Sequence, residues 1–549
     1  MKTALHSSWY CIIASMLLYA SPVFAQGNIA AEQVDIVKAY QPLLADAEKI
    51  DFAAEPVGAD TSMPVLSYEV KSHLIEVPFT PAEIRAVSLP AAVPDTLQNN
   101  ILTAGFGMQL TPLIDLQLHN GAAGNLSYGL NLHHLSSNGS KIDYQDFSHT
   151  GGNIFGTAYV GSSALSASFG YDHRKNYNYA AAAADTGSIE KQSLKRTYNL
   201  VPVELAFANT KNAKDKMNYR FGFRYHHFDG LSDADYLFTE KEDYFNFNVS
   251  LQKPFRKIHA ISLELSFEHL QHKLVSVTDT AQSLLTVVPY YQLLWKNLML
   301  QAGVNVSLLG KEVTFFPRIH AEYKLIGEYL IPYAGWEGGW HPVTLPELTT
   351  VNPYLGNCSP DFTKVNKGYA GIKGSYGNFI SYNVGAELRS QSNLPLYLPD
   401  SLNPAYYEVL YYYHADIINV HAEIGYRQSE RISLLLSGET NIYDLDFDDE
   451  PWGLPKSKID LAFNYNIQDK IVAKLDLFAN SGAFTKMPSD SVSTQLKGRA
   501  DASISVSYDY KKNISCWLAF NNIFGANNTP WFNYPTYGFQ AMAGVRLKF

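Results

Sequence analysis

A chain of 549 residues with 17% charged residues is less charged than soluble domains, which have roughly 25%. Its formal net charge of −10 offers no basic surface, so we expect no nucleic-acid partner. The mean hydropathy of −0.14 is too low for a bundle of membrane-spanning helices. A membrane β-barrel has values of this kind, because half of each strand is polar.

The first residues have the features of a secretory signal peptide. Lys2 gives a basic start, Trp9 to Ala20 form an apolar run, and residues 23–25 (VFA) provide a small-residue cleavage site. The alternative, a membrane anchor, would need a longer apolar run. We therefore predict that residues 1–25 are a cleaved signal peptide.

Residues 26–99 contain many prolines and end in the stretch SLPAAVPDTLQNN. They carry one candidate strand or short helix, EQVDIVKAYQPLLADAEKI. We predict an N-terminal extension that is either a partial plug folded into a barrel lumen or a periplasmic tether.

From about residue 100 to 549, runs of alternating apolar and polar residues are separated by turns. Examples are 298–308 (LMLQAGVNVSL), 261–268 (ISLELSFE) and 500–509 (ADASISVSYD). A strand that crosses a membrane needs this alternation, with lipid on one side and water on the other. A soluble β-sandwich alternates too, but its apolar face is the interior.

Connection length distinguishes these two folds, because membrane barrels alternate short periplasmic turns with longer outer loops. Short turns occur at 296–297, 428–430, 468–470 and 511–513. Long connections occur near 137–152, 173–195, 228–242, 270–283, 338–366, 391–404, 441–456, 481–498 and 523–537. With 405–426 taken as one long strand, short and long connections alternate strictly. We therefore predict an all-β, antiparallel transmembrane barrel of 22 strands, with both ends in the periplasm.

Two cysteines follow the predicted signal peptide. We expect Cys358 in an outer loop and Cys516 near the periplasmic start of the penultimate strand, on its apolar face. Opposite ends of the wall are too far apart for a disulfide.

The polar face of the strands is the best-supported functional surface in the sequence. Charged residues that line a pore can set its selectivity, whereas the plainer interpretation is hydration or contact with a plug. The predicted lumen-lining residues are Glu264, Glu268, Gln301, Asn305, Asp460, Asn464, Lys474, Asp476, Asp501, Asp509, Arg546 and Lys548.

Two stretches suggest chemistry. His133 and His134 lie close to Ser136 and Ser137, but neighbours on a strand point to opposite faces, so the two histidines cannot share a site. The stretch YDLDFDDEPW (443–452) contains Asp444, Asp446, Asp448, Asp449 and Glu450, a weak candidate for calcium. The favoured alternative is a strand tip with acids in water. No catalytic motif is present, so we expect neither an enzyme nor a cofactor.

Several stretches resemble the TonB-dependent receptor-like barrels of Bacteroidota, particularly a subgroup with a reduced or absent plug. They are GFGMQLTPL (105–113), SYGLNLHHLSSNG (127–139), NPYLG (352–356), GYAGIKGSYG (368–377), ISVSYDYKKNISCWLAFNNIFG (504–525) and YPTYGFQAMAGVRLKF (534–549). The resemblance implies a 22-stranded outer-membrane barrel and TonB-coupled uptake. It also implies that the terminal aromatic, Phe549, is part of the signal for the barrel assembly machinery.

The chain departs from that family in its N-terminal region, because residues 26–99 are too few for the usual globular plug. QVDIVKAY (33–40) is similar to a Ton box, although a periplasmic strand or tether is the favoured interpretation.

We expect a Gram-negative outer-membrane protein for passage or gated uptake of a solute. Its expected partners are outer-membrane lipid and lipopolysaccharide, the assembly machinery, and TonB or a surface lipoprotein. Two alternatives are a structural barrel within an envelope complex and a lipid-modifying enzyme.

Overall fold

The computed structural model describes residues 100–121, 124–139, 142–180, 190–210, 216–232, 239–256, 258–274, 279–401, 403, 405–446, 450–486, 493–525 and 528–549. The barrel belongs to the unit Leu89–Phe549. The predicted signal peptide (1–25) and extension (26–99) lie outside the described residues.

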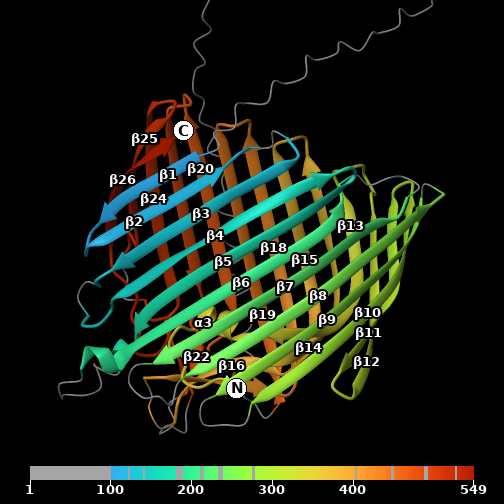
Figure 1. Cartoon of the computed structure of the whole chain (residues 1–549), viewed down its shortest axis with the longest axis horizontal. Helices are drawn as coiled ribbons and strands as arrows, with labels where there is room; N and C mark the ends of the chain where they lie inside the picture. Colours follow the sequence, from blue (N-terminus) through green and yellow to red (C-terminus); the bar gives the residue numbers. More distant parts are fainter. Residues whose placement is uncertain are drawn as a thin grey trace, which may run out of the picture. The chain divides into compact units, whose positions relative to one another are not determined.

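Twenty-two antiparallel strands form one sheet, as predicted, and the sheet closes because β1 pairs with both β2 and β26 (Figure 1). The wall strands are β1 (Asn100–Gly107), β2 (Thr111–His119), β3 (Leu126–Ser137), β4 (Phe147–Val160), β5 (Ser163–Tyr177), β6 (Lys195–Asn209), β7 (Asn218–Ser232), β8 (Glu240–Phe255), β9 (His259–Leu274), β10 (Thr280–Trp295), β11 (Leu298–Leu309), β12 (Glu312–Tyr323), β13 (Ile331–Val343), β14 (Asp361–Tyr376), β15 (Ile380–Ser392), β18 (Ala415–Gln428), β19 (Ile432–Leu445), β20 (Ser457–Ile467), β21 (Ile471–Asn480), β24 (Arg499–Lys511), β25 (Ile514–Asn521) and β26 (Gln540–Lys548). Closure leaves the wall without an unpaired edge.

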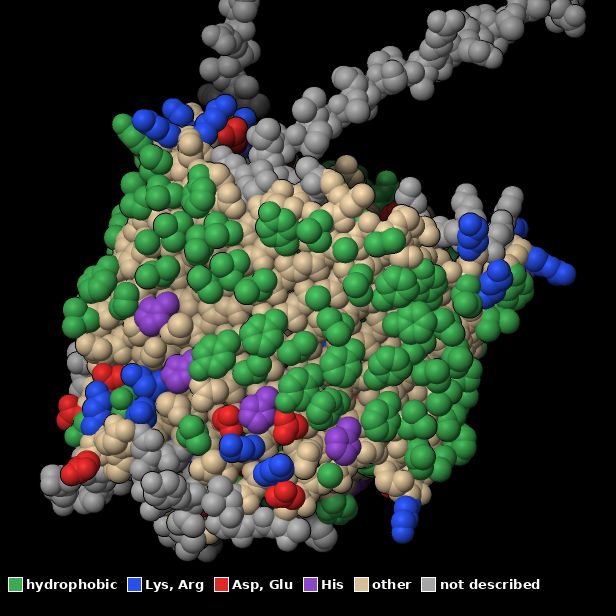
Figure 2. Space-filling view, in the orientation of Figure 1, with side chains coloured by type: hydrophobic (Ala, Val, Ile, Leu, Met, Phe, Trp, Pro, Cys, Tyr) green, Lys and Arg blue, Asp and Glu red, His purple; other side chains and the backbone are tan. Residues whose placement is uncertain are grey.

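The outside of this wall is apolar. Figure 2 shows hydrophobic side chains spread over the visible face of the barrel. Large apolar side chains that remain exposed in mid-strand include Leu132, Ile154, Phe169, Leu205, Phe247, Phe267, Phe315, Ile372, Leu388, Ile442 and Leu518. In water such a surface would drive association, whereas lipid is its natural solvent.

The connections differ at the two ends of the barrel, which we call the turn end and the loop end. At the turn end β10 and β11 are joined by residues 296–297, and Lys296 has φ 50°, as tight hairpins require. At the loop end most connections are long, including 344–360 and 522–539. The prediction of strict alternation is wrong, because 108–110 and 310–311 are short turns at the loop end and 324–330 is a longer connection at the turn end.

The prediction of a single strand over 405–426 is also wrong. The chain forms β17 (Tyr407–Tyr412), breaks, and resumes as wall strand β18 at Ala415. β17 pairs with β16 (Leu394–Pro399) in a hairpin that belongs to the loop rather than to the wall. The count of 22 holds because β17 does not contribute to the wall.

Short elements complete the loop end: η1 (Lys191–Leu194), α3 (Leu345–Val351), β22 (Phe484–Thr485) and β23 (Thr494–Gln495). None of the helices in the described part of the chain has both the length and the apolar character needed to cross a membrane.

Cys358 is buried in a loop and Cys516 is exposed on β25, and both are free thiols, as the sequence predicts.

Candidate functional site

Several residues predicted to line the lumen are paired with other side chains or with the backbone. Arg318 Nη1 on β12 lies 2.9 Å from Glu264 Oε2 on β9. Glu268 accepts a 2.8 Å hydrogen bond from the Tyr244 hydroxyl, and Asn305 donates one of 2.8 Å to the Gly338 carbonyl. Glu264, Glu268, Asn305 and Arg318 line a recess of about 370 Å³. This stretch of wall is polar and largely neutralised, rather than a ring of one charge sign.

The other predicted lumen residues have varied surroundings. Asp460, Lys474 and Asp476 are exposed, while Gln301, Asn464, Asp509, Arg546 and Lys548 are half-buried. Asp501 is buried and accepts hydrogen bonds from the Phe524 backbone N–H (3.1 Å) and the Asn528 amide (3.5 Å). Asp501 therefore holds the final loop, 522–539, against the wall.

The acidic stretch does not converge on a common point in its described part. The Tyr413 hydroxyl donates to an Asp446 carboxylate oxygen, and Glu450 lies 3.3 Å from Lys456 Nζ. Asp444 is exposed at the end of β19, while Asp448 and Asp449 lie outside the described residues.

Phe549 is 63% exposed, directly after β26, and its backbone N–H donates to the Asn100 carbonyl at 3.0 Å.

The most deeply packed region of the described chain is a cluster of loop residues, which we call the loop core. It comprises Tyr179, Ala180, Tyr198, Phe228, Leu345, Leu348, Leu355, Cys358, Tyr397, Ala405, Tyr406, Tyr407, Trp531 and Tyr534. Most of these come from four different connections at the loop end, with wall residues Tyr198 and Phe228 beneath them.

Aromatic contacts join these connections to one another. The rings of Tyr354 and Tyr534 stack with centroids 3.6 Å apart, and the Tyr179 ring meets both edge-on at 5.7 and 4.9 Å. Trp531 packs edge-on against Tyr407 at 5.2 Å. Aromatic pairs of this kind contribute about 0.5–1.5 kcal/mol beyond the apolar area they bury.

The connection 344–360 crosses from its own side of the barrel to another. It begins after β13, yet its backbone is held by side chains of β6 and β8. Leu345 N–H donates to Glu242 on β8 at 2.7 Å, and Arg196 on β6 donates to the Leu355 carbonyl at 2.6 Å. Because β13 lies several strands from β6 in the ring, these bonds require the connection to pass across the opening.

Several polar groups of the loop core have hydrogen-bond partners. The Tyr534 hydroxyl donates to the Ala405 carbonyl, the Phe532 N–H donates to the Tyr407 hydroxyl at 2.7 Å, and the Cys358 N–H donates to Glu240 at 2.6 Å. Burial raises the pKa of the Tyr354 and Tyr534 phenols and of the Cys358 thiol, so these groups stay neutral at physiological pH.

The loop core could not be predicted from the sequence, because loops have no periodicity to mark which residues are buried.

The sequence does predict that His133 and His134 point to opposite faces of their strand. His133 contacts His149 (3.1 Å), whereas His134 bonds Thr150 (2.7 Å) and Ser136 (3.1 Å). The contact between His133 and His149 depends on the register of β3 and β4, which the alternation of residues along a single strand does not fix.

No protein-family model matches the chain, and no curated protein matches it. Solved structures do match its fold. The FrpB iron transporter from Neisseria meningitidis (F3-3 variant) aligns with a TM-score of 0.65 and 11% identity over 82% of this chain and 81% of its own. The closed form of the ferric-catecholate import receptor Fiu from E. coli K12 aligns with a TM-score of 0.61 and 11% identity, over 82% of both chains.

The siderophore receptor PirA from Acinetobacter baumannii also matches, with a TM-score of 0.64 and 11% identity over 82% of this chain and 80% of its own. At such identities the likeness establishes the fold alone. The chain therefore shares the 22-stranded barrel of these import receptors.

Proposed function

We propose that this chain is an outer-membrane barrel for the gated uptake of a solute, of the TonB-dependent receptor-like type. Its apolar exterior suits lipid, its polar lumen suits a hydrated solute, and its fold is that of import receptors. In this proposal residues 1–25 direct export, residues 26–99 form the periplasmic tether or partial plug, and Phe549 marks the barrel for assembly.

One observation carries the proposal: the loops meet across the mouth. A barrel of this width encloses an aqueous channel unless something fills it. Here the connection 344–360 crosses the opening and packs with the final loop through Tyr354 and Tyr534. A barrel shut by movable connections, rather than by the wall, is suited to gating.

We propose the polar wall residues as the surface along the solute path, with the pair of Glu264 and Arg318 among them. A binding or transport role needs no bond-making step. The structural neighbours are transport receptors, which favours transport over enzymatic activity. Further proposed partners are lipopolysaccharide and, as in the resembling family, TonB; the bacterial source we propose is Bacteroidota.

Coupling to TonB is testable on the intact protein. Purified full-length protein is passed over immobilised TonB periplasmic domain, beside a variant in which QVDIVKAY (33–40) is replaced by a Gly-Ser segment of equal length. Retention of the first and loss of the second supports energised uptake. If both proteins are retained equally, residues 33–40 do not bind TonB. If neither protein is retained and a surface lipoprotein co-purifies instead, the chain is a structural partner barrel.

A further inference from the structure

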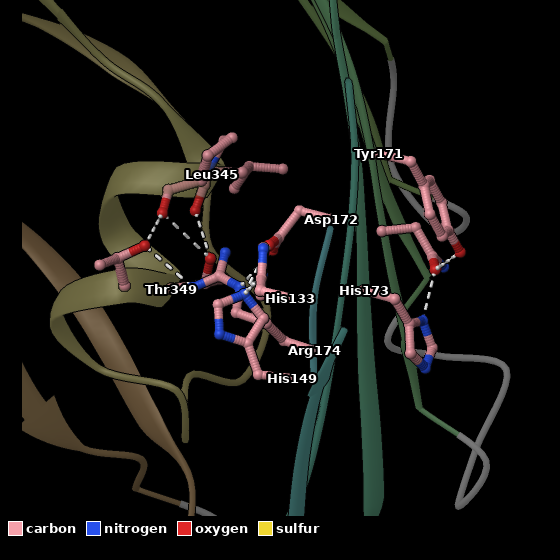
Figure 3. Close-up of polar contacts among 11 residues, drawn as sticks. His133, His149, Tyr171, Asp172, His173, Arg174, Leu345 and Thr349 are labelled. Atoms are coloured by element: carbon pink, nitrogen blue, oxygen red, sulfur yellow. Dashed lines mark hydrogen bonds and ion pairs between the residues drawn. The ribbon is translucent and has the colours of Figure 1, made fainter. Parts of the chain in front are cut away.

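Three potential metal ligands converge on the lumen wall, from three neighbouring strands. His133 Nε2 on β3 lies 3.1 Å from His149 Nε2 on β4, and Asp172 Oδ2 on β5 lies 2.5 and 3.6 Å from His149 and His133. All three atoms lie within 4.8 Å of one another, and this is the one such group of three His, Cys, Asp or Glu residues in the described part of the chain. Figure 3 shows the cluster on one side of the strands, with Tyr171 and His173 on the other.

Strand register and a glycine create the space for this cluster. Gly151 on β4 pairs with His133 on one side and with Asp172 on the other. His133, Gly151 and Asp172 therefore lie in one row across the sheet. A Cβ atom at Gly151 would come within 2.6 Å of the His133 ring. Because Gly151 has no side chain, the imidazole can lie over it and reach towards Asp172 and His149.

Hydrogen bonds alone satisfy this arrangement poorly. A neutral imidazole nitrogen either donates one hydrogen or accepts one. If His149 Nε2 donates to Asp172, its hydrogen points away from His133, which lies 3.1 Å from the same nitrogen. If His149 Nε2 accepts from His133 instead, no hydrogen lies between that nitrogen and the carboxylate oxygen of Asp172 at 2.5 Å. A cation at the centre would accept lone pairs from all three atoms.

We propose that His133, His149 and Asp172 bind one divalent transition-metal ion on the lumen wall. Two imidazole nitrogens and one carboxylate oxygen suit zinc or its first-row neighbours, whereas calcium and magnesium prefer oxygen ligands. Bonds of about 2.0–2.2 Å to one ion place tetrahedral ligands about 3.3 Å apart. The observed separations of 3.1 and 3.6 Å are close to this value, and the third, 2.5 Å, must lengthen.

The surroundings favour an open coordination site. The two imidazoles are 40% and 41% exposed and Asp172 is 24% exposed, so water or a solute ligand has access to the remaining positions. Arg174 Nε lies 3.3 Å from the other carboxylate oxygen, Oδ1, which leaves Oδ2 for the metal. Arg174 also donates to Thr350 Oγ1 at 2.9 Å, so the site adjoins the connection that crosses the mouth. The nearby positive charge of Arg174 should weaken the binding of a cation.

The test is isothermal titration of Zn²⁺ into the purified full-length protein, prepared without a polyhistidine tag. We expect one site, and a loss of affinity of at least about tenfold in His133→Ala, His149→Ala and Asp172→Asn. Gly151→Val should weaken binding too, although it leaves all three ligands in the chain. Co²⁺ titration supplies a second readout, a visible ligand-field spectrum that the His133→Ala variant should lose.

The matched controls are His134→Ala and His173→Ala, which remove histidines adjacent in sequence that do not belong to the cluster. Both should keep wild-type affinity. Variants are compared only if they retain the gel mobility of the folded barrel. Wild-type protein that binds no Zn²⁺, or controls that lose as much affinity as His133→Ala, would overturn the proposal. The outcome is independent of uptake, since a barrel that transports nothing could still hold the ion.

Discussion

The wall and the loop core use their aromatic and apolar residues in opposite ways. In the wall, Phe267 on β9 remains 45% exposed because its environment is lipid, and its neighbour Glu268 lies on the opposite face of the strand, where it accepts a hydrogen bond from Tyr244. In the loop core, Tyr407 and Tyr534 are 1% and 0% exposed and pack like the interior of a soluble domain. The wall depends on its closed ladder of backbone hydrogen bonds, whereas the loop core depends on side-chain packing. Substitutions should therefore separate the two regions.

The largest expected effect is in the loop core. Tyr534→Ala removes a ring that contacts Tyr354, Tyr179 and Tyr407. We expect it to destabilise the loop core by about 3–5 kcal/mol, the usual cost of truncating a buried aromatic, while the wall stays folded. Limited proteolysis of the folded barrel should then cut the loops. Phe524→Ala, in the same connection but at a residue that is 62% exposed, is the control and should preserve protection.

The next effect concerns the wall alone. Phe267→Lys places a charge on the lipid face and should cost about 2–4 kcal/mol near the middle of the membrane. Ser266→Lys, one residue away, places the same charge on the lumen face beside Glu268 and should cost less than about 1 kcal/mol. Urea unfolding from lipid bilayers measures both. Equal costs would contradict the assignment of the two faces.

A smaller effect should distinguish two glutamates that both point inward. Glu242 has a fully buried side chain and accepts from the Leu345 N–H and from His226, each at 2.7 Å. Glu242→Ala leaves that N–H unpaired and should cost the loop core about 1–3 kcal/mol. Glu264→Ala breaks a half-exposed ion pair with Arg318 and should cost about 0–1 kcal/mol. The urea dependence of loop proteolysis compares them, and a larger effect at Glu264 would refute this ranking.

Cys358 offers a kinetic probe of the same region. Burial raises the pKa of its thiol, so the reactive thiolate is scarce at pH 8 and becomes more abundant only as the pH rises further. In a Cys516→Ala background we expect slow alkylation at pH 8, and acceleration of about tenfold or more when Tyr534→Ala is added. Alkylation of the intact protein at the rate of an exposed thiol would mean that the loop core is open.

The sequence is informative where structure repeats and uninformative where it does not. Period-two alternation identified the strand that contains Leu298 and Leu308, and with it the barrel and its 22 strands. The same pattern misled at Tyr407–Tyr412, since a loop hairpin alternates as a wall strand does. The loop core could not be predicted because its packing joins residues from connections far apart in the chain.

The histidine cluster is an intermediate case. The two-residue turn between β4 and β5 fixes the register that pairs Gly151 with Asp172. That register places His149 and Asp172 on one face, and the alternation of residues along β3 places His133 on the same face. What the sequence does not give is the distance between their side chains.

Single-channel conductance in a planar bilayer shows whether the loop core closes the mouth of the barrel. The protein is measured with residues 26–99 removed, so that only the barrel and its loops remain. We predict no steady conductance from this protein, and a large steady conductance once residues 345–358 and 394–412 are each replaced by short Gly-Ser turns. A large steady conductance before the loops are replaced would contradict the account.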